Sequence, residues 1–183
     1  MRILKNVFSQ LHRWVLWAVL SAVFWAWIFT LVTDAAPARK VTLYAHVDRC
    51  EDKALAVRLE ESRPQGIKLV KVHPFSYVMF SRTDLEQADL YILPASEAEA
   101  MLEAFAPLDE EDWDYGGREL YRSEGRIYGV KVYDAASGTG AAAQYLGYTP
   151  GEDYYLFFNA ASPHLGSGDG AALRIAEALL RLD

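Results

Sequence analysis

The sequence predicts an α/β domain with a mostly parallel sheet flanked by helices, preceded by one transmembrane helix. Two observations predict this class. Residues 14–33 form an uncharged, largely apolar run near the N-terminus. After this run, short segments rich in β-branched and aromatic residues alternate with segments of helical periodicity, the order expected when strands and their covering helices build one layered domain.

The N-terminal run is long enough to cross a bilayer. A helix of these 20 residues spans about 30 Å, which matches a hydrocarbon core, and it lacks the polar stripe of a soluble core helix. Three basic residues and no acidic residue precede the run, which favours a cytoplasmic location for residues 1–13. We therefore expect a single-pass protein of the cell membrane that contacts the lipid bilayer through residues 14–33, with its C-terminal domain extracytoplasmic.

A cleaved signal peptide is the competing interpretation of the same run. The small residues Ala36-Pro37-Ala38 stand at a suitable place for cleavage. However, the apolar region of a signal peptide has about 7–15 residues, and this run is longer and rich in tryptophan. We favour an uncleaved signal anchor followed by a polar linker at 34–40, and both interpretations export the domain.

The charge of the residues that follow the run, 34–183 (the linker and the domain at 41–183), limits the partners of the protein. The chain has 18 basic and 25 acidic residues, and three of the basic ones precede residue 34, which leaves 15 against 25 and a net charge of −10. This charge repels nucleic acid and anionic lipid headgroups, so we expect no nucleic-acid partner. Cys50 is the only cysteine and the four histidines lack ligand spacing, so we expect no metal site and no cofactor.

The first half of the domain alternates strands with helices. The strand segments are rich in Val, Ile, Leu and Tyr. In the first helix, Leu55 and Leu59 share one side, and Pro64 follows its end. Ser96 and Glu99 have the spacing of a capping box at the start of the second helix. The expected elements are a strand at 41–47, a helix at about 50–63, a strand at 67–73, a loop or short helix at 74–82, a strand at 89–93 and a helix from 96 to about 105.

A hairpin opens the second half of the domain. Leu120-Tyr121 and residues 126–133 flank the turn Ser123-Glu124-Gly125, which is typical of two antiparallel strands. The stretch 141–146 has the composition of a helix start. A further strand at 154–159 and an amphipathic helix at 171–182 complete the domain.

Several short motifs follow one another along the chain in an order that matches a known protein family. They are VTLYAHVD at 41–48, IKLVKVHPF at 67–75, Ala88-Asp89-Leu90-Tyr91-Ile92-Leu93-Pro94, Ala106-Pro107-Leu108-Asp109, Tyr128-Gly129-Val130-Lys131, and DYYLFFN at 153–159 with Ser162 and His164. Together they resemble the first lobe of bacterial extracellular solute-binding proteins, the sugar-binding type served by ABC transporters. Lys131 stands where that family usually has proline.

The resemblance implies a single lobe of a protein that normally has two. Members of the family trap their ligand between two lobes, whereas here about 20 residues join the hairpin to the returning strand, which is too short for a second lobe. One lobe offers half a cleft and no hinge closure.

We therefore expect a non-catalytic, membrane-anchored, solute-binding-like domain. It would recognise a small ligand (a sugar, a peptide or an oxyanion) or dock on a membrane partner such as a transporter. The alternative is an interaction subunit of a membrane complex that binds no ligand.

Candidate binding residues follow from the rule that ligands of open α/β sheets sit beyond the carboxyl ends of the strands. Aromatic and polar side chains at these positions suit sugars or peptides, although Phe75 and Tyr77 would equally serve as loop anchors packed on the core. The candidates are His46, Asp48, His73, Phe75, Tyr77, Ser96, Asp134, Ser137 and Thr139.

The stretch from Asp134 to Gly140 is the most distinctive of these. Its glycines permit backbone amides to converge, so it suits an oxyanion, as does a similar Ser-Gly-Thr loop in phosphate-type binding proteins. The simpler interpretation is a crossover that replaces the missing lobe. A hydrolase is a weaker alternative, with Ser137 its best candidate nucleophile, because the stretch does not match a nucleophile elbow. No pair of carboxylates and no Ser or Cys with a His stands out as catalytic.

Overall fold

The protein is described here from a computed structural model. The structure describes residues 2–33, 36–75, 88–109, 115–166 and 170–182. It divides into two compact units, residues 1–36 and residues 37–183, and each unit is described by itself.

The first unit is one continuous helix, α1 (Arg2–Thr33). The helix ends at Thr33, where the uncharged run ends, and it begins well before that run. Trp14, Trp17, Trp25 and Trp27 are exposed. Among the described residues, α1 is the one helix long and apolar enough to cross a membrane, a property that a signal sequence shares.

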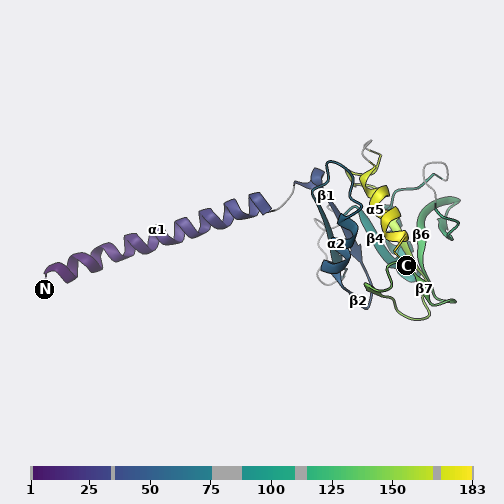
Figure 1. The fold of residues 1–183 in the computed structure, drawn as a ribbon, viewed down its shortest axis with the longest axis horizontal. Coiled ribbons are helices and arrows are strands. Elements are labelled where there is room, and N and C mark those ends of the chain that lie inside the picture. The colour runs from purple at the N-terminus through teal and green to yellow at the C-terminus, as the bar shows by residue number, and fades with distance from the viewer. Residues whose placement is uncertain (1, 34–35, 76–87, 110–114, 167–169, 183) are drawn as a thin grey trace. The chain divides into compact units, whose positions relative to one another are not determined.

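The second unit is built on a mixed sheet of seven strands (Figure 1). The order across the sheet is β3-β1-β4-β9-β6-β5, with β7 also paired to β6. The strands are β1 (Lys40–Ala45), β3 (Leu69–Pro74), β4 (Leu90–Pro94), β5 (Leu120–Ser123), β6 (Arg126–Asp134), β7 (Thr139–Gly140) and β9 (Tyr154–Phe158). β1 pairs in parallel with β3 and β4, and all other pairs are antiparallel.

The prediction of a mostly parallel sheet is therefore wrong. A parallel pair needs a crossover connection that carries the chain back along the sheet, usually as a helix. Residues 141–146 have the composition of a helix start, but they form turns and enter β8 (Leu146–Gly147), which pairs with β2 (Arg49–Cys50). Without a crossover, β9 has to run opposite to β6 and to β4.

One face of the sheet is covered by two helices, α2 (Asp52–Glu60) and α5 (Ala171–Leu180) (Figure 1). Leu55 and Leu59 of α2 are fully buried against aliphatic side chains of the sheet, as the helical periodicity predicted. The predicted strands near 41–47, 67–73, 89–93 and 154–159 are present, as is the closing helix. A short 3-10 turn, η1 (Pro37–Arg39), leads into β1.

The other face of the sheet is aromatic. Phe105 stacks on Phe157 with ring centroids 4.3 Å apart, and Tyr91 lies 5.8 Å from Phe105. Gly129 makes room for this layer, because a Cβ there would lie 2.8 Å from the Phe157 ring. Two short helices, α4 (Ala95–Ala98) and η2 (Glu99–Ala104), follow β4, and Ala98 packs into the aromatic cluster.

The hairpin and the start of the second helix are local features that the sequence predicted. The hairpin is confirmed, since β5 and β6 pair around Glu124 and Gly125, whose φ angles of 49° and 78° suit a two-residue turn. The capping box is wrong: the helix begins at Ala95, its N-cap Pro94 makes no side-chain cap bond, and Ser96 lies inside the first turn.

Candidate functional site

The carboxyl ends of four strands meet along one edge of the sheet. β1, β3 and β4 are parallel, and β6 runs the same way because β9 lies between β4 and β6 and opposes both. Most of the residues predicted as binding candidates therefore lie on this edge, which we call the carboxyl edge. Tyr77 lies outside the described residues.

At the ends of β1, β3 and β4 the structure brings together an ionisable pair and a ring. His46 follows β1, and its Nδ1 lies 2.6 Å from Oε2 of Glu97 on α4. The buried Phe75, which follows β3, lies 5.4 Å from the His46 ring. Ser96 donates its hydroxyl hydrogen to Glu152, across from the start of β9.

The other candidates on this side have separate surroundings. Asp48 accepts a hydrogen bond from the Thr149 hydroxyl at 3.1 Å and faces the small β2-β8 sheet. The His73 ring packs against Tyr44 with ring centroids 5.3 Å apart, on the aromatic face.

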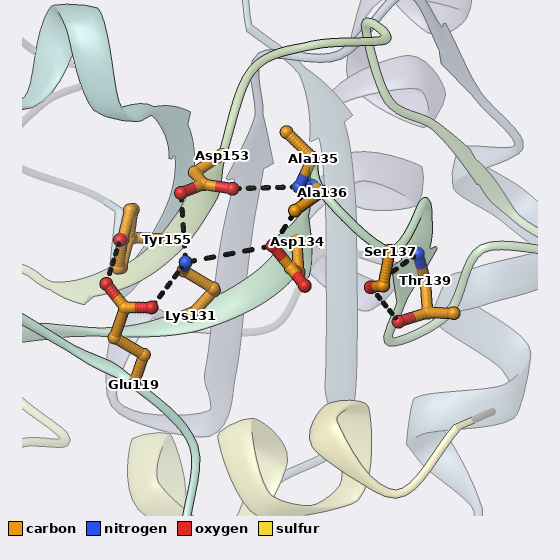
Figure 2. A network of polar contacts seen from close by, with 9 residues as sticks. All are labelled: Glu119, Lys131, Asp134, Ala135, Ala136, Ser137, Thr139, Asp153 and Tyr155. Atoms are coloured by element: carbon orange, nitrogen blue, oxygen red, sulfur yellow. Dashed lines mark hydrogen bonds and ion pairs between the residues drawn. The ribbon is translucent and has the colours of Figure 1, made fainter.

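At the end of β6, Lys131 organises a second polar group that we call the lysine network (Figure 2). Its Nζ lies 2.6 Å from Oε2 of Glu119, 2.9 Å from Oδ2 of Asp153 and 4.0 Å from Oδ1 of Asp134. The ammonium also lies 5.6 Å from the centre of the Tyr155 ring. One cation, with a side chain only 12% exposed, thus stands among three carboxylates.

The pKa values of these groups reflect their mutual hydrogen bonds. Burial opposes the charge of Lys131, but the bonds to Glu119 and Asp153 outweigh it and raise the pKa of the ammonium. The pKa of Asp153 is lowered by the hydrogen bond from the Ala135 amide and then by that from Lys131. The pKa of Asp134 is lowered first by its hydrogen bond with Ser137. All three groups therefore stay ionised near neutral pH.

The backbone amides of the turn after β6 donate hydrogen bonds to acceptors within the protein. The Ala135 amide donates to Asp153 at 2.8 Å, and the Ala136 amide donates to Asp134 at 3.2 Å. The Thr139 amide donates to the Ser137 hydroxyl at 3.3 Å, and the two hydroxyls lie 2.7 Å apart. Figure 2 shows the Asp153 carboxylate against the first of these amides, where an oxyanion ligand would have to bind.

A cavity opens beside the lysine network, where the outer side of β6 lacks a paired strand. β5 pairs with β6 up to Val130, and β7 pairs with it at Tyr133 and Asp134. Between them the volume is about 710 Å³. We call this gap the notch; it is lined by Arg118, Glu119, Lys131, Val132, Tyr133, Asp134, Gly138, Thr139, Gly140 and Ala143.

Residues 152 and 153 connect the two halves of the carboxyl edge. Asp153 accepts hydrogen bonds from Lys131 and from the Ala135 amide, and its carbonyl accepts one from the Ala95 amide at 2.9 Å. Its neighbour Glu152 accepts the bond from Ser96. The predicted binding residues do not include Glu97, Glu119, Lys131, Glu152 or Asp153. One signal was present, because Lys131 is a charged residue within an otherwise apolar strand segment.

A cluster of buried polar side chains, which we call the buried lock, lies at the opposite edge of the sheet. Asp89, at the start of β4, accepts a hydrogen bond from the Thr42 amide at 2.7 Å and one from the Ser162 hydroxyl. Asn159 donates to the Ala88 carbonyl at 2.7 Å. Burial raises the pKa of Asp89, and the hydrogen bonds oppose that rise.

His164 extends this lock to the start of the domain. Its Nε2 lies 3.1 Å from the carbonyl oxygens of Pro37 and of Lys40. Ser162, Asp89 and His164 therefore bind one another and the backbone in a buried position. The motif residues Asp89, Asn159, Ser162 and His164 thus have structural partners.

No protein-family model matches the chain, and neither a curated protein nor a solved structure is significantly similar to it. The function proposed below is accordingly based on the geometry of the domain itself.

Proposed function

We propose that this protein is a membrane-anchored, non-catalytic recognition domain that docks through its carboxyl edge on a partner protein in the same membrane. α1 serves as the uncleaved anchor, and the domain is displayed outside the cytoplasm. The observation that carries the proposal is the notch between β5 and β7, a cavity of about 710 Å³ rimmed by charged side chains and located at the sheet edge.

The shape of the site favours a protein surface over a trapped solute. Sites for small molecules are usually concave, mostly apolar and bury most of the ligand. The rim carboxylates of the notch are in contrast open to solvent, with the Glu119 side chain 64% exposed and that of Asp134 40% exposed. Residues 135–153 between β6 and β9 are also too few to form a second lobe that could close over a ligand.

A photo-crosslinking experiment in native membranes tests the docking proposal. Benzoylphenylalanine replaces Thr139 in the notch of the full-length chain, and a matched control carries it at Val57, an exposed position on α2. We expect a discrete adduct with a membrane protein from position 139 and none from position 57. Equal labelling from both positions, or no adduct from position 139, contradicts docking at this edge.

Capture of a small solute is the second candidate, because the volume of the notch lies within the range of about 300–1,000 Å³ that ligand sites occupy. Sugars, short peptides, phosphate and sulfate are the classes to test. Calorimetric titration of the full-length protein in nanodiscs discriminates the two functions. Binding of a sugar that Glu119→Gln weakens, or of phosphate or sulfate that Glu119→Gln strengthens, selects the solute function. Binding of cationic peptides alone is the result expected for docking, and silence across the panel removes the solute function.

The orientation in the membrane is part of the same proposal. Protease added outside intact cells should digest residues 37–183 and leave α1 protected. N-terminal sequencing of the mature protein should find the residues that precede Trp14, since an uncleaved anchor keeps them. A mature chain that starts after Ala38 would instead identify α1 as a signal peptide.

A further inference from the structure

The notch exposes negative charge and conceals most of its positive charge. Glu119 and Asp134 are 64% and 40% exposed on the rim, whereas Lys131 is 12% exposed. The Lys131 ammonium is already bonded to Glu119 and to Asp153. A group that enters the notch therefore meets carboxylate oxygens before it meets a free ammonium.

The second cation of the lining is also engaged. Arg118 donates from Nη2 to the Leu180 carbonyl at 2.8 Å, where it caps the end of α5. The backbone of β6 in the notch is engaged too, since the Lys131 amide donates to the Glu119 carbonyl and the Val132 carbonyl accepts from the Ala141 amide. These bonds disfavour both the addition of a partner strand to β6 and the binding of an anion.

We infer that the notch accepts a cationic side chain, arginine or lysine, presented by the partner protein. The inference rests on the proposed docking function and names the chemistry that the partner would bring. Carboxylates bind guanidinium groups through hydrogen bonds, and the rim supplies two exposed carboxylates, Glu119 and Asp134. Both also accept bonds within the protein, so the entering cation would share these oxygens with Lys131 and the turn. The net charge of −10 on residues 34–183 attracts a basic surface over a longer range.

The test uses the full-length protein in nanodiscs of zwitterionic phosphatidylcholine, which has no net charge of its own to attract the probes. The probes are three labelled seven-residue Gly-Ser peptides that differ at the central position: arginine, its neutral isostere citrulline, or glutamate. Affinity is measured by fluorescence anisotropy at low and high salt. We expect binding in the order arginine, citrulline, glutamate, and weaker binding of the arginine peptide at high salt.

Variants connect the binding to the notch. Glu119→Gln keeps a hydrogen-bond acceptor and removes one charge, so it should weaken the arginine peptide about three- to fivefold. Asp134→Asn should act in the same direction. Glu103→Gln makes an identical change of net charge on the exposed side of η2 and should leave the affinity unchanged. Equal affinity for arginine and citrulline, equal effects of Glu119→Gln and Glu103→Gln, or no binding at millimolar peptide each overturn the inference.

The crosslinking experiment separates failure of this inference from failure of the docking function. An adduct at position 139 that weakens in Glu119→Gln supports both. An adduct that is undiminished in Glu119→Gln and in Asp134→Asn overturns the cationic contact and leaves the docking function standing. The absence of any adduct in the wild-type background overturns the docking function itself.

Discussion

Replacing Lys131 by methionine tests whether the lysine network stabilises the domain as a unit of paired charges. Lys131→Met keeps an unbranched side chain of similar length, but Glu119 and Asp153 lose the ammonium that lies 2.6 and 2.9 Å away. Breaking a buried ion pair costs roughly 3–5 kcal/mol, and an exposed pair contributes about 0.2–1 kcal/mol. Lys131 is 12% exposed, Asp153 31% and Glu119 64%, so we expect an intermediate loss. We estimate about 2 kcal/mol of unfolding free energy.

Urea unfolding of the full-length protein in nanodiscs, followed by circular dichroism, measures this loss. Lys53→Met is the matched control, because Lys53 is an exposed lysine on α2. We expect the control to change the unfolding free energy by no more than about 0.5 kcal/mol. The deficit of Lys131→Met at pH 7 should exceed that of the control by at least a factor of two.

The pH dependence of this loss of unfolding free energy independently checks that charge pairing causes it. In the wild type the lowered pKa of Asp153 means that its contribution is complete above the ordinary carboxyl pKa of about 4 and is lost as the pH falls through the lowered value. In Lys131→Met the carboxylates repel one another until they are protonated. The difference between the two proteins should therefore shrink as the pH falls from 7 towards about 3. A deficit that matches the control, or one that is the same at both pH values, refutes the reasoning.

Three further substitutions have expected outcomes. Thr42→Val should raise the unfolding free energy by about 1 kcal/mol, because the buried Thr42 hydroxyl has no hydrogen-bond partner among the described residues. Thermal unfolding checks this, and a loss above that of Thr42→Ser contradicts it. Gly129→Ala should cost about 1–3 kcal/mol in urea unfolding, because its Cβ would lie 2.8 Å from the Phe157 ring and 2.9 Å from a backbone oxygen; a neutral result refutes the close fit. Asp153→Asn should reduce the loss of unfolding free energy as the pH falls below about 4, as measured by acid unfolding, since it removes a carboxyl with a lowered pKa. An unchanged pH dependence in this range counts against that contribution.

Local sequence patterns predicted the presence of the helices and strands of this domain better than the directions of its strands. The apolar side of α2, the hairpin around Gly125 and the strand before Asn159 each depend on residues close in the chain, and each is present. The direction of β9 depends instead on what joins it to β6. The composition of residues 141–146 suggested a helix there, whereas Tyr148 packs on Tyr133 with ring centroids 4.6 Å apart and the segment forms turns.

The location of the candidate site was predicted from the sequence, but only some of its residues were. The rule for strand ends led to His46, Ser96 and Asp134, which lie on the carboxyl edge. It missed Lys131 as the centre of the lysine network, because its partners Glu119 and Asp153 lie 12 and 22 residues away in the chain. Pairings at such distances follow from sheet order, which periodicity alone does not determine.

The position of the buried lock has a consequence for how this chain can evolve. Asp89, Ser162 and His164 hold one end of β4 and β9, and the notch lies at the other end, a strand length of about 16 Å away. Substitutions separated by more than about 10 Å tend to act additively on stability. The notch can therefore diversify to suit a changing partner while the lock preserves the fold, and distant relatives should be sought through the lock rather than through the notch.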